Sequence, residues 1–254
     1  TAKPSENQLI DVKHHFINNL SVTDNYTVGD YKDEVNAFLN LYFNTNDYVV
    51  MVGGSGLFID AVINGIDDFP KVPKSLRNKI NSDFEKKGID YLKDELKKLD
   101  PKYYKIVDLK NHRRIIRALE VCYFSDKPYS SFLNSSKKKA KKYDEIIIGL
   151  NPRKEILEIR INNRVDEMIN GGLIKEVKSL LKYRDLNPLN TVGYKELFEF
   201  FDGFISLKDA IELIKLNTRK YSKRQMTWFK KNKDILWFEK NDKNLIEKLK
   251  KINN

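Results

Sequence analysis

The sequence has little of the residue types that mark several classes of protein. Its 254 residues include one cysteine, Cys122, which excludes an intrachain disulfide framework and a zinc site built from several cysteines. This scarcity of cysteine is typical of a reducing compartment, so we expect a cytoplasmic protein. The longest apolar runs, such as residues 48–52, are far shorter than the roughly 20 residues that span a bilayer, so no membrane segment is expected. His14, His15 and His112 lack metal-ligand spacing to carboxylates, so no protein-built metal site is predicted.

Positive charge, in contrast, is in excess. The chain has 47 lysines and arginines against 36 aspartates and glutamates, which gives a formal net charge of +11. Such an excess favours a polyanionic partner, although a lysine-rich composition alone produces the same number. The position of the arginines therefore matters more than the total.

Three short apolar runs predict β-strands in an α/β protein. They cover residues 47–52, 145–150 and 235–238, and helical patterns lie between them. Because the runs are continuously apolar rather than alternating, they indicate a parallel sheet covered on both faces.

Helical patterns without a convincing strand fill residues 70–128, which we interpret as an insertion in the α/β core. Its clearest helix begins near Asn111 and places Ile115, Leu119 and Cys122 on one face. Two further helices are predicted at residues 154–170, before Gly171-Gly172, and from Ser206 towards Lys231, where Ser206 acts as the cap. The expected division is a first core segment at 1–69, a helical insertion at 70–135 and a second core segment at 136–254. The lysine-rich run at 135–142 is expected to be a solvated linker.

The turn Gly53-Gly54-Ser55-Gly56 is the first candidate binding site. It offers backbone N–H groups, a helix N-terminus and a hydroxyl at the carboxyl end of the first predicted strand, where ligands bind in open α/β sheets. A tight turn that needs glycine only for backbone freedom is an equally good interpretation. The Gly-Lys-Ser/Thr ending of a Walker A loop is absent.

Arg160 and Arg164 lie four residues apart on a predicted helix, so both guanidinium groups can point at one diphosphate. On spacing alone, a pair of solvated arginines balanced by Glu158 and Asp166 is the more usual arrangement.

Two basic clusters favour an RNA backbone. Arg113, Arg114 and Arg117 crowd one turn of the insertion helix. The second cluster, on the last helix, consists of Arg219, Lys223, Arg224, Lys230 and Lys231, accompanied by Gln225, Thr227 and Trp228. The alternative is that Trp228 belongs to the core and the lysines are merely solvated, and the roles of Thr227 and Trp228 stay open between core and ligand contact.

A third candidate segment, Asn190 to Lys195, precedes another predicted helix. Thr191 is expected to cap that helix, and Tyr194 is placed to stack on a base. A tyrosine buried in the core is the alternative.

Six segments, taken together and in register, resemble the tRNA dimethylallyltransferase (tRNA isopentenyltransferase) family as far as about Phe238. They are Thr1-Ala2-Lys3-Pro4, His14-His15-Phe16-Ile17, Val52-Gly53-Gly54-Ser55-Gly56-Leu57-Phe58, Arg117-Ala118-Leu119-Glu120, Val192-Gly193-Tyr194-Lys195 and Lys223-Arg224-Gln225-x-Thr227-Trp228.

The resemblance implies an α/β fold with a P-loop-NTPase-like parallel sheet core flanked by helices and a helical insertion domain. It also implies transfer of a dimethylallyl group from dimethylallyl diphosphate, with Mg²⁺, to N6 of the adenosine 3′ of the anticodon in tRNAs reading codons that begin with U. The partners would be that diphosphate and the tRNA anticodon stem-loop, and a monomer is expected.

Site roles follow from the same resemblance. Arg164 matches a diphosphate-binding arginine, with Gly53, Gly54 and Arg160 added from spacing, and Ser55 matches a hydroxyl position near the flipped adenosine. The catalytic residues would be Ser55 and Arg164. The positions expected to contact tRNA are Ser55, Arg77, Arg113, Arg114, Ile115, Ile116, Arg117, Asn190, Thr191, Val192, Gly193, Tyr194, Lys195, Arg219, Lys223 and Arg224.

One departure from the family pattern is large. The family's P-loop and its general-base aspartate precede the Thr1-Ala2-Lys3-Pro4 motif, so we expect that an N-terminal segment is missing and that these residues alone are not fully active. Two rivals stay open: a P-loop small-molecule kinase, and a non-catalytic RNA-binding module.

Overall fold

The computed structural model describes residues 1–133, 143–239 and 247, and the chain divides into two compact units. The sheet unit comprises Thr1–Thr27, Val50–Gly56 and Glu145–Asn254, and the helical unit comprises Val28–Val49 and Leu57–Asp144. The predicted basic linker at 135–142 lies outside the described residues. The three-part division drawn from the sequence stays a prediction.

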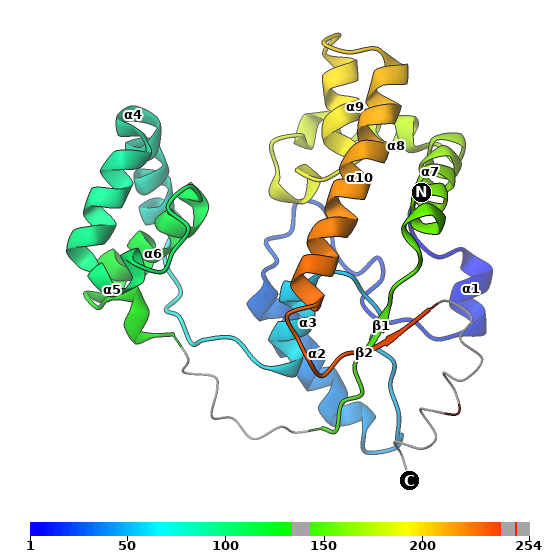
Figure 1. The fold of residues 1–254 in the computed structure, drawn as a ribbon, viewed down its shortest axis with the longest axis horizontal. Coiled ribbons are helices and arrows are strands. Elements are labelled where there is room, and N and C mark those ends of the chain that lie inside the picture. The colour runs from blue at the N-terminus through cyan, green and yellow to red at the C-terminus, as the bar shows by residue number, and fades with distance from the viewer. Residues whose placement is uncertain (134–142, 240–246, 248–254) are drawn as a thin grey trace. The chain divides into compact units, whose positions relative to one another are not determined.

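A two-stranded parallel sheet joins distant parts of the sheet unit (Figure 1). Strand β1 (Ile148–Leu150) pairs with β2 (Leu236–Phe238), so that Gly149 lies opposite Trp237. A Cβ atom on Gly149 would come within 2.5 Å of the Trp237 ring, so glycine is required here for close packing. Both strands fall inside runs that the sequence predicted, although β1 is shorter than its run.

The expectation of a strand at residues 47–52 is wrong for this structure. The segment has no regular secondary structure, and Val50 and Val52 are 84% and 89% exposed. The expectation that both faces of the sheet are covered is wrong as well, because Leu150 of β1 is 57% exposed. A strand obtains its hydrogen bonds and its cover from neighbouring elements, and an apolar run by itself supplies neither.

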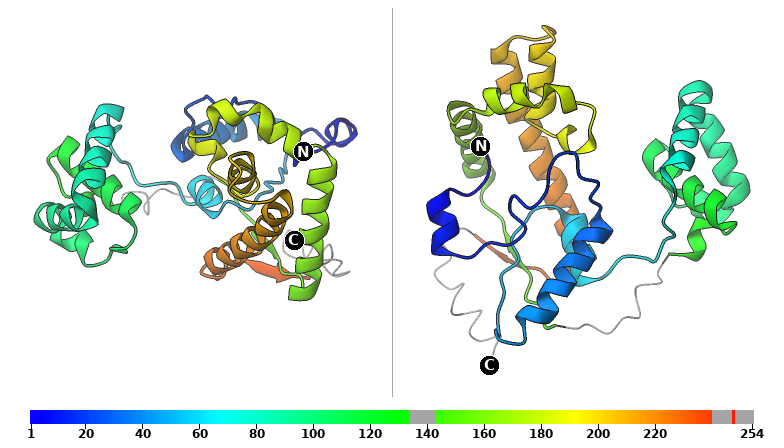
Figure 2. Two further views of the ribbon diagram at one scale, coloured as in Figure 1. Left: turned by 90° about the horizontal axis from the view of Figure 1, so that it is seen from above. Right: turned by 180° about the vertical axis from the view of Figure 1, so that it is seen from behind.

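Helices form most of the sheet unit (Figure 2). They are α1 (Glu6–Asp11), α7 (Lys154–Asn170), α8 (Leu173–Ser179), α9 (Tyr194–Phe201) and α10 (Leu207–Phe229), with short 3₁₀ turns at Leu181–Tyr183 and Asn187–Leu189. The predictions for α7 and α10 are confirmed. The Ser206 hydroxyl accepts a hydrogen bond from the Asp209 N–H at 3.1 Å, which caps α10 as the sequence indicated.

The core of the sheet unit lies between α7, α8, α9 and α10. Val165, Val177, Leu197 and Ile214, one from each helix, are at most 2% exposed. Long helix α10 packs against both α7 and α9 and so links most of the unit.

The helical unit contains α2 (Val28–Tyr42), α3 (Gly56–Ile63), α4 (Lys74–Leu99), α5 (Pro101–Tyr104), α6 (His112–Ser125) and a 3₁₀ turn at Tyr129–Ser131. Residue Gly56, where α3 begins, belongs to the sheet unit. Helix α4 bends at Gly88, whose φ of 77° is a conformation that favours glycine.

The prediction for α6 is confirmed in both its start and its buried face. Asn111 caps the helix by accepting a hydrogen bond from the Arg114 N–H at 3.3 Å. Ile115 and Leu119 are at most 1% exposed and pack against Leu92 and Leu96 of α4. Each such side chain contributes about 1.5–3 kcal/mol by burial, so this contact fixes α6 on α4. In the part of the chain that the structure describes, no helix has the length and apolar character to cross a membrane.

Candidate functional site

The glycine turn is held by the end of helix α10. The Gln225 side-chain amide donates a hydrogen bond to the Gly54 carbonyl at 2.9 Å, across 171 residues of sequence. A Cβ atom on Gly54 would lie 2.2 Å from Gln225 Nε2, and one on Gly56 would lie 2.3 Å from the Trp228 ring. Neither glycine has a positive φ, so close approach rather than backbone freedom explains them.

This contact bears on the two residues whose roles the sequence left open. Trp228 is 38% exposed and lies against the turn rather than deep in a core. The Thr227 hydroxyl donates to the Lys223 carbonyl one helical turn earlier, at 2.9 Å. The Ser55 side chain remains exposed within the turn, where a ligand can reach its hydroxyl.

Arg160 and Arg164 are both exposed on α7. Arg219 of α10 lies beside the same stretch of helix, because its guanidinium donates to Asn162 Oδ1 at 2.9 Å. Gln225 is six residues further along α10, which corresponds to about 9 Å of helix. Helix α10 therefore connects the glycine turn to the segment of α7 that carries the two arginines.

Both arginines are solvated, as the alternative interpretation expected, but Asp166 is not the acid that balances them. Asp166 forms an ion pair with Lys215 at 2.9 Å rather than with an arginine. Arg164 contacts Glu167 instead, at 3.5 Å and with both side chains at least half exposed, so this pair contributes little. Within the described ranges, no ion pair is recorded for Arg160.

The other members of the α10 cluster are solvent-facing. Lys223 and Arg224 are exposed, and the Arg224 guanidinium lies 5.6 Å from the Tyr221 ring centroid. Lys230 follows at the C-terminal end of the helix and is also exposed. The side chains are accessible to a polyanion, but their assigned role in tRNA binding stays a prediction.

A hollow of about 390 Å³ lies in the helical unit where the first basic cluster was predicted. Its lining residues are Tyr103, Asn111, Arg113, Arg114, Arg117 and Tyr129. Tyr103 and Tyr129 are in ring contact, with centroids 4.5 Å apart. Among the residues that the structure describes, neither Arg113 nor Arg114 has an ion pair, so their charge is available to an anionic ligand.

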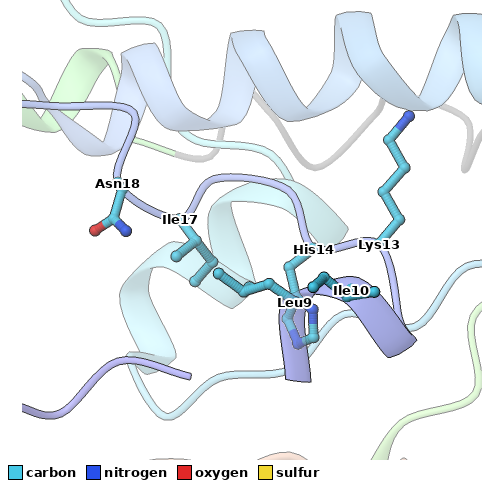
Figure 3. Close-up of a pocket in the computed structure, with 6 residues that line it drawn as sticks. All are labelled: Leu9, Ile10, Lys13, His14, Ile17 and Asn18. Carbon is cyan, nitrogen blue, oxygen red and sulfur yellow. The ribbon is translucent and has the colours of Figure 1, made fainter. Parts of the chain in front are cut away.

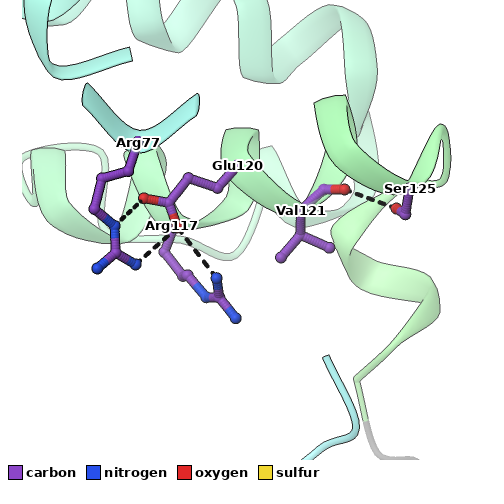
Figure 4. A network of polar contacts seen from close by, with 5 residues as sticks. All are labelled: Arg77, Arg117, Glu120, Val121 and Ser125. Carbon is purple, nitrogen blue, oxygen red and sulfur yellow. Dashed lines mark hydrogen bonds and ion pairs between the residues drawn. The ribbon is translucent and has the colours of Figure 1, made fainter. Parts of the chain in front are cut away.

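Arg77 and Arg117 converge on Glu120, which is 1% exposed (Figure 4). Arg77 donates through Nε at 2.5 Å and Nη2 at 2.9 Å, and Arg117 donates through Nη1 at 3.1 Å. The hydrogen bonds to Glu120 raise the pKa of Arg77 above its ordinary value, so the guanidinium stays protonated. Arg117 also lies 5.6 Å from the Phe69 ring centroid.

The expectation that Ile115 and Ile116 contact tRNA needs correction. Their side chains are 0% and 5% exposed and form part of the α4–α6 core. Because residues three and four apart share one face of a helix, one stripe of α6 packs on α4 and the arginines lie on the remaining surface. These isoleucines therefore position the arginines and do not themselves reach a ligand through their side chains.

The segment Asn190 to Lys195 is anchored by a second buried acid. Glu196, 4% exposed, accepts hydrogen bonds from the Gly193 N–H at 2.8 Å and from Asn217 Nδ2 at 2.7 Å. Gly193 is the N-cap of α9, so the prediction that Thr191 caps it is wrong: the Glu196 carboxylate already satisfies that end.

Within this segment, Asn190, Thr191 and Lys195 are exposed, Val192 is half-buried and Gly193 is buried. The Tyr194 ring is half-buried, and its hydroxyl donates to Glu176 Oε1. Burial and this bond raise the pKa of Tyr194, so the phenol stays neutral. Base stacking by Tyr194 stays a prediction.

A second hollow, of about 400 Å³, lies at the N-terminal segment that carries the two adjacent histidines (Figure 3). It is lined by Leu9, Ile10, Lys13, His14, Ile17 and Asn18. His14 Nδ1 lies 2.6 Å from the Val12 carbonyl oxygen. Phe16 and Asn18 have positive φ angles of 61° and 56°, an unusual conformation that the sequence did not reveal.

The sequence analysis did not predict two residues, Gln225 and Glu120, that hold other site residues in place. Gln225 and Glu120 both occur in the quoted motifs, but a motif does not say what a side chain touches. The only available signal was that each shares a motif with residues assigned to the site.

Comparison with known proteins identifies the family. The IPP transferase family model matches residues 1–232. The chain belongs to the IPP transferase family. It is 49% identical to the tRNA dimethylallyltransferase of Flavobacterium johnsoniae, over 94% of this chain and 79% of that protein. It is also 49% identical to the tRNA dimethylallyltransferase of Christiangramia forsetii, over 100% of this chain and 84% of the relative.

Solved structures place the fold in the same family. The full-length tRNA isopentenylpyrophosphate transferase of Bacillus halodurans has 31% identity and a TM-score of 0.67, over 99% of this chain and 81% of that one. A eukaryotic dimethylallyltransferase described as acting on tRNA gives a TM-score of 0.77 at 24% identity, over 98% of this chain and 66% of that one, and supports the fold alone. This IPP transferase is thus an α/β protein with many helices and a small parallel sheet.

Proposed function

We propose that this IPP transferase moves a dimethylallyl group from dimethylallyl diphosphate to N6 of the adenosine 3′ of the anticodon (position 37) in tRNAs reading codons that begin with U, giving N6-isopentenyladenosine. The family match over residues 1–232 carries the proposal, and relatives at 49% identity named tRNA dimethylallyltransferase support it.

The reaction requires the adenine amine to be aligned with the allylic carbon of dimethylallyl diphosphate. The exocyclic amine of adenine is a weak nucleophile, so it must be fixed against the allylic carbon while the departing diphosphate is stabilised. Arg160 and Arg164 on α7 are exposed and suited to a diphosphate, with the glycine turn offering backbone N–H groups. The exposed Ser55 hydroxyl is assigned to the adenosine side of the reaction.

Mg²⁺ is the cofactor that this chemistry requires, to neutralise the diphosphate. Within residues 1–133, 143–239 and 247, no group of three His, Cys, Asp or Glu residues is placed to hold a metal ion. A protein-built cage does not fit these residues, so we assign the ion to the substrate diphosphate and derive no step through it.

The tRNA is assigned to the basic surfaces. Arg77, Arg113, Arg114 and Arg117 of the helical unit would grip the anticodon stem-loop, and Arg219, Lys223 and Arg224 with the Asn190–Lys195 segment would add backbone contacts. In this proposal, the core is P-loop-NTPase-like, and residues 70–135 form a tRNA-binding insertion.

A prenyl-transfer assay tests the proposal directly. The protein is incubated with Mg²⁺, dimethylallyl diphosphate and a tRNA bearing adenosine 3′ of its anticodon, and the nucleosides are identified by mass spectrometry. A dimethylallyl adduct on that adenosine is expected, with none on a matched tRNA bearing guanosine there. Tight tRNA binding without an adduct would leave only an RNA-binding module, and loss of both would reject the proposal.

A further inference from the structure

Two buried carboxylates bond to residues that line the hollow in the helical unit, and the proposed function gives them no role. Only three polar or charged residues are fully buried in the described part of the chain, namely Asp100, Glu120 and Glu196. Two of them, Asp100 and Glu120, lie behind the walls of this one hollow. Burying a carboxylate is unfavourable unless its bonds are satisfied, so the arrangement of those bonds is informative.

In the described part of the chain, the charged groups bonded to Glu120 are two arginines. Its Oε1 accepts from Arg77 Nε, and its Oε2 accepts from both Arg77 Nη2 and Arg117 Nη1. The carboxylate is 1% exposed, whereas the side chains of Arg77 and Arg117 are 54% and 35% exposed. Figure 4 shows both arginine side chains reaching the same carboxylate. The acid is therefore buried, whereas both arginine side chains are partly accessible to solvent.

Asp100 fixes the aromatic wall in a comparable way. One carboxylate oxygen accepts from the Tyr103 N–H at 2.9 Å and the Ser130 hydroxyl at 2.9 Å, and the other accepts from the Ser130 N–H at 2.6 Å. Tyr103 and Tyr129, which line the hollow, are thereby held on the two segments that this one carboxylate joins.

The Tyr129 ring is already occupied on another side. It stacks on Phe69, with centroids 4.6 Å apart and an interplanar angle of 14°. Because the rings pack on one another and three arginines line the same hollow, its chemistry fits a compact anion better than an additional stacked base.

We propose that Glu120 is a positioning residue that presets Arg117 at the wall of this hollow, with Arg113 and Arg114 beside it, to bind a backbone phosphate of the tRNA. This inference rests on the proposed function and adds the acceptor group and the residue that prepares the site. A forked guanidinium held from behind loses less freedom when it binds a phosphate oxygen.

The effect of Glu120→Gln on tRNA affinity has opposite signs for a positioning role and for simple electrostatic repulsion. Glu120→Gln removes a negative charge from a tRNA-binding surface, which by Coulomb's law alone should strengthen binding of a polyanion. If Glu120 positions Arg117, the same change should weaken binding by about three- to tenfold. It should also lower the slope of log K against log salt by about 1, because one phosphate contact is lost.

The experiment measures tRNA affinity of the whole protein across a salt series for the wild type, Glu120→Gln, Arg117→Ala and the double variant. We expect the two single effects to be non-additive, so that Glu120→Gln changes little once Arg117 is absent. Glu95→Gln is the matched control, since Glu95 pairs with Lys98 and Tyr123 on the same unit but is outside the hollow. It should bind tRNA as tightly as the wild type or slightly more tightly.

Urea unfolding shows whether Glu120→Gln remains folded. Should it unfold, Arg117→Lys serves in its place, because lysine keeps the charge but lacks the fork that contacts Glu120 and a phosphate together. Weakened binding with a shallower salt slope is expected for that variant.

Wild-type or tighter binding by a folded Glu120→Gln, or full additivity with Arg117→Ala, would overturn the proposal. Prenyl transfer by the wild type, assayed in parallel, keeps this outcome distinct from failure of the proposed function.

Discussion

The two groups of arginines in this protein are held in different ways. In the helical unit, Arg77 and Arg117 are bonded to the buried carboxylate of Glu120. On α7 of the sheet unit, Arg164 has, among the described residues, a single exposed ionic contact, with Glu167 at 3.5 Å. The first group is organised by the protein itself, which suits recognition of a large preformed surface such as tRNA. The second group is held only loosely by the protein, and in the proposed function its ligand is a small diphosphate that brings its own charge.

The largest effect expected from this contrast concerns Arg164. We expect Arg164→Ala to lower kcat/KM for dimethylallyl diphosphate by about 10²–10³-fold, because a donor to the leaving group is lost. Its tRNA dissociation constant should stay within about twofold of the wild type. Steady-state kinetics and RNA binding check both values. Arg184→Ala is the matched control, since Arg184 pairs with Asp202 elsewhere on the surface of the same unit. If Arg164→Ala lost tRNA binding and kept normal diphosphate kinetics, the assigned roles would be reversed.

The second prediction tests whether packing holds the first group in place. Leu119→Ala removes a side chain that is 1% exposed beneath the arginines of α6. We expect the free energy of unfolding of the helical unit to fall by about 2–5 kcal/mol, with weaker tRNA binding. Urea unfolding followed by circular dichroism measures the loss. Exposed Ile106→Ala, at a residue 67% exposed on the same unit, should change it by less than about 0.5 kcal/mol.

The third prediction concerns the organising contact of the sheet unit. Gly56→Ala would place a Cβ atom 2.3 Å from the Trp228 ring, so the turn or the helix end must shift. We expect a loss of about 1–3 kcal/mol in stability and slower prenyl transfer. The double variant Gly56→Ala, Trp228→Leu should recover part of the stability in a thermal melt. Additive losses would show that this contact does not hold the turn.

Arg114→Ala gives a smaller effect and addresses the hollow. Removing one guanidinium should weaken tRNA binding by a similar factor for all tRNAs and reduce the salt slope by about 1. Fluorescence anisotropy at several salt concentrations measures both quantities. At saturating tRNA, the kinetics of Arg114→Ala with dimethylallyl diphosphate should be unaffected. An unchanged salt slope would mean that Arg114 does not contact a phosphate.

The smallest effect is a dependence on alkaline pH. Burial raises the pKa of Tyr129 from 10.0 to about 12, so the folded state favours the neutral phenol. Its contribution to stability is complete below pH 10 and is lost as the pH rises through about 12. Tyr129→Phe should therefore flatten the decline of stability in this window, as measured by urea midpoints. If Tyr129→Phe lost stability with rising pH as the wild type does, the decline would come from other groups, such as Tyr103, whose pKa is also raised by burial.

Helices were predicted correctly where a capping residue preceded a run of apolar residues with helical spacing. Ser206 caps α10 and α6 begins next to Asn111, both as predicted, and Ile115, Leu119 and Cys122 form the buried face of α6. The assignment of Ile115 and Ile116 to tRNA failed because a contiguous motif was treated as one surface, whereas a helix turns its consecutive residues in different directions.

The sequence by itself determined the class of the protein, helices α6, α7 and α10, the two strands that the structure contains and the positions of the basic clusters, since these depend on residue type and short-range spacing. Tertiary structure decided what those residues do to one another. The bond between Gln225 and Gly54 spans 171 residues, and that between Arg77 and Glu120 spans 43. It also decided that residues 47–52 form no strand, because backbone pairing and burial are supplied by neighbours that local spacing cannot specify.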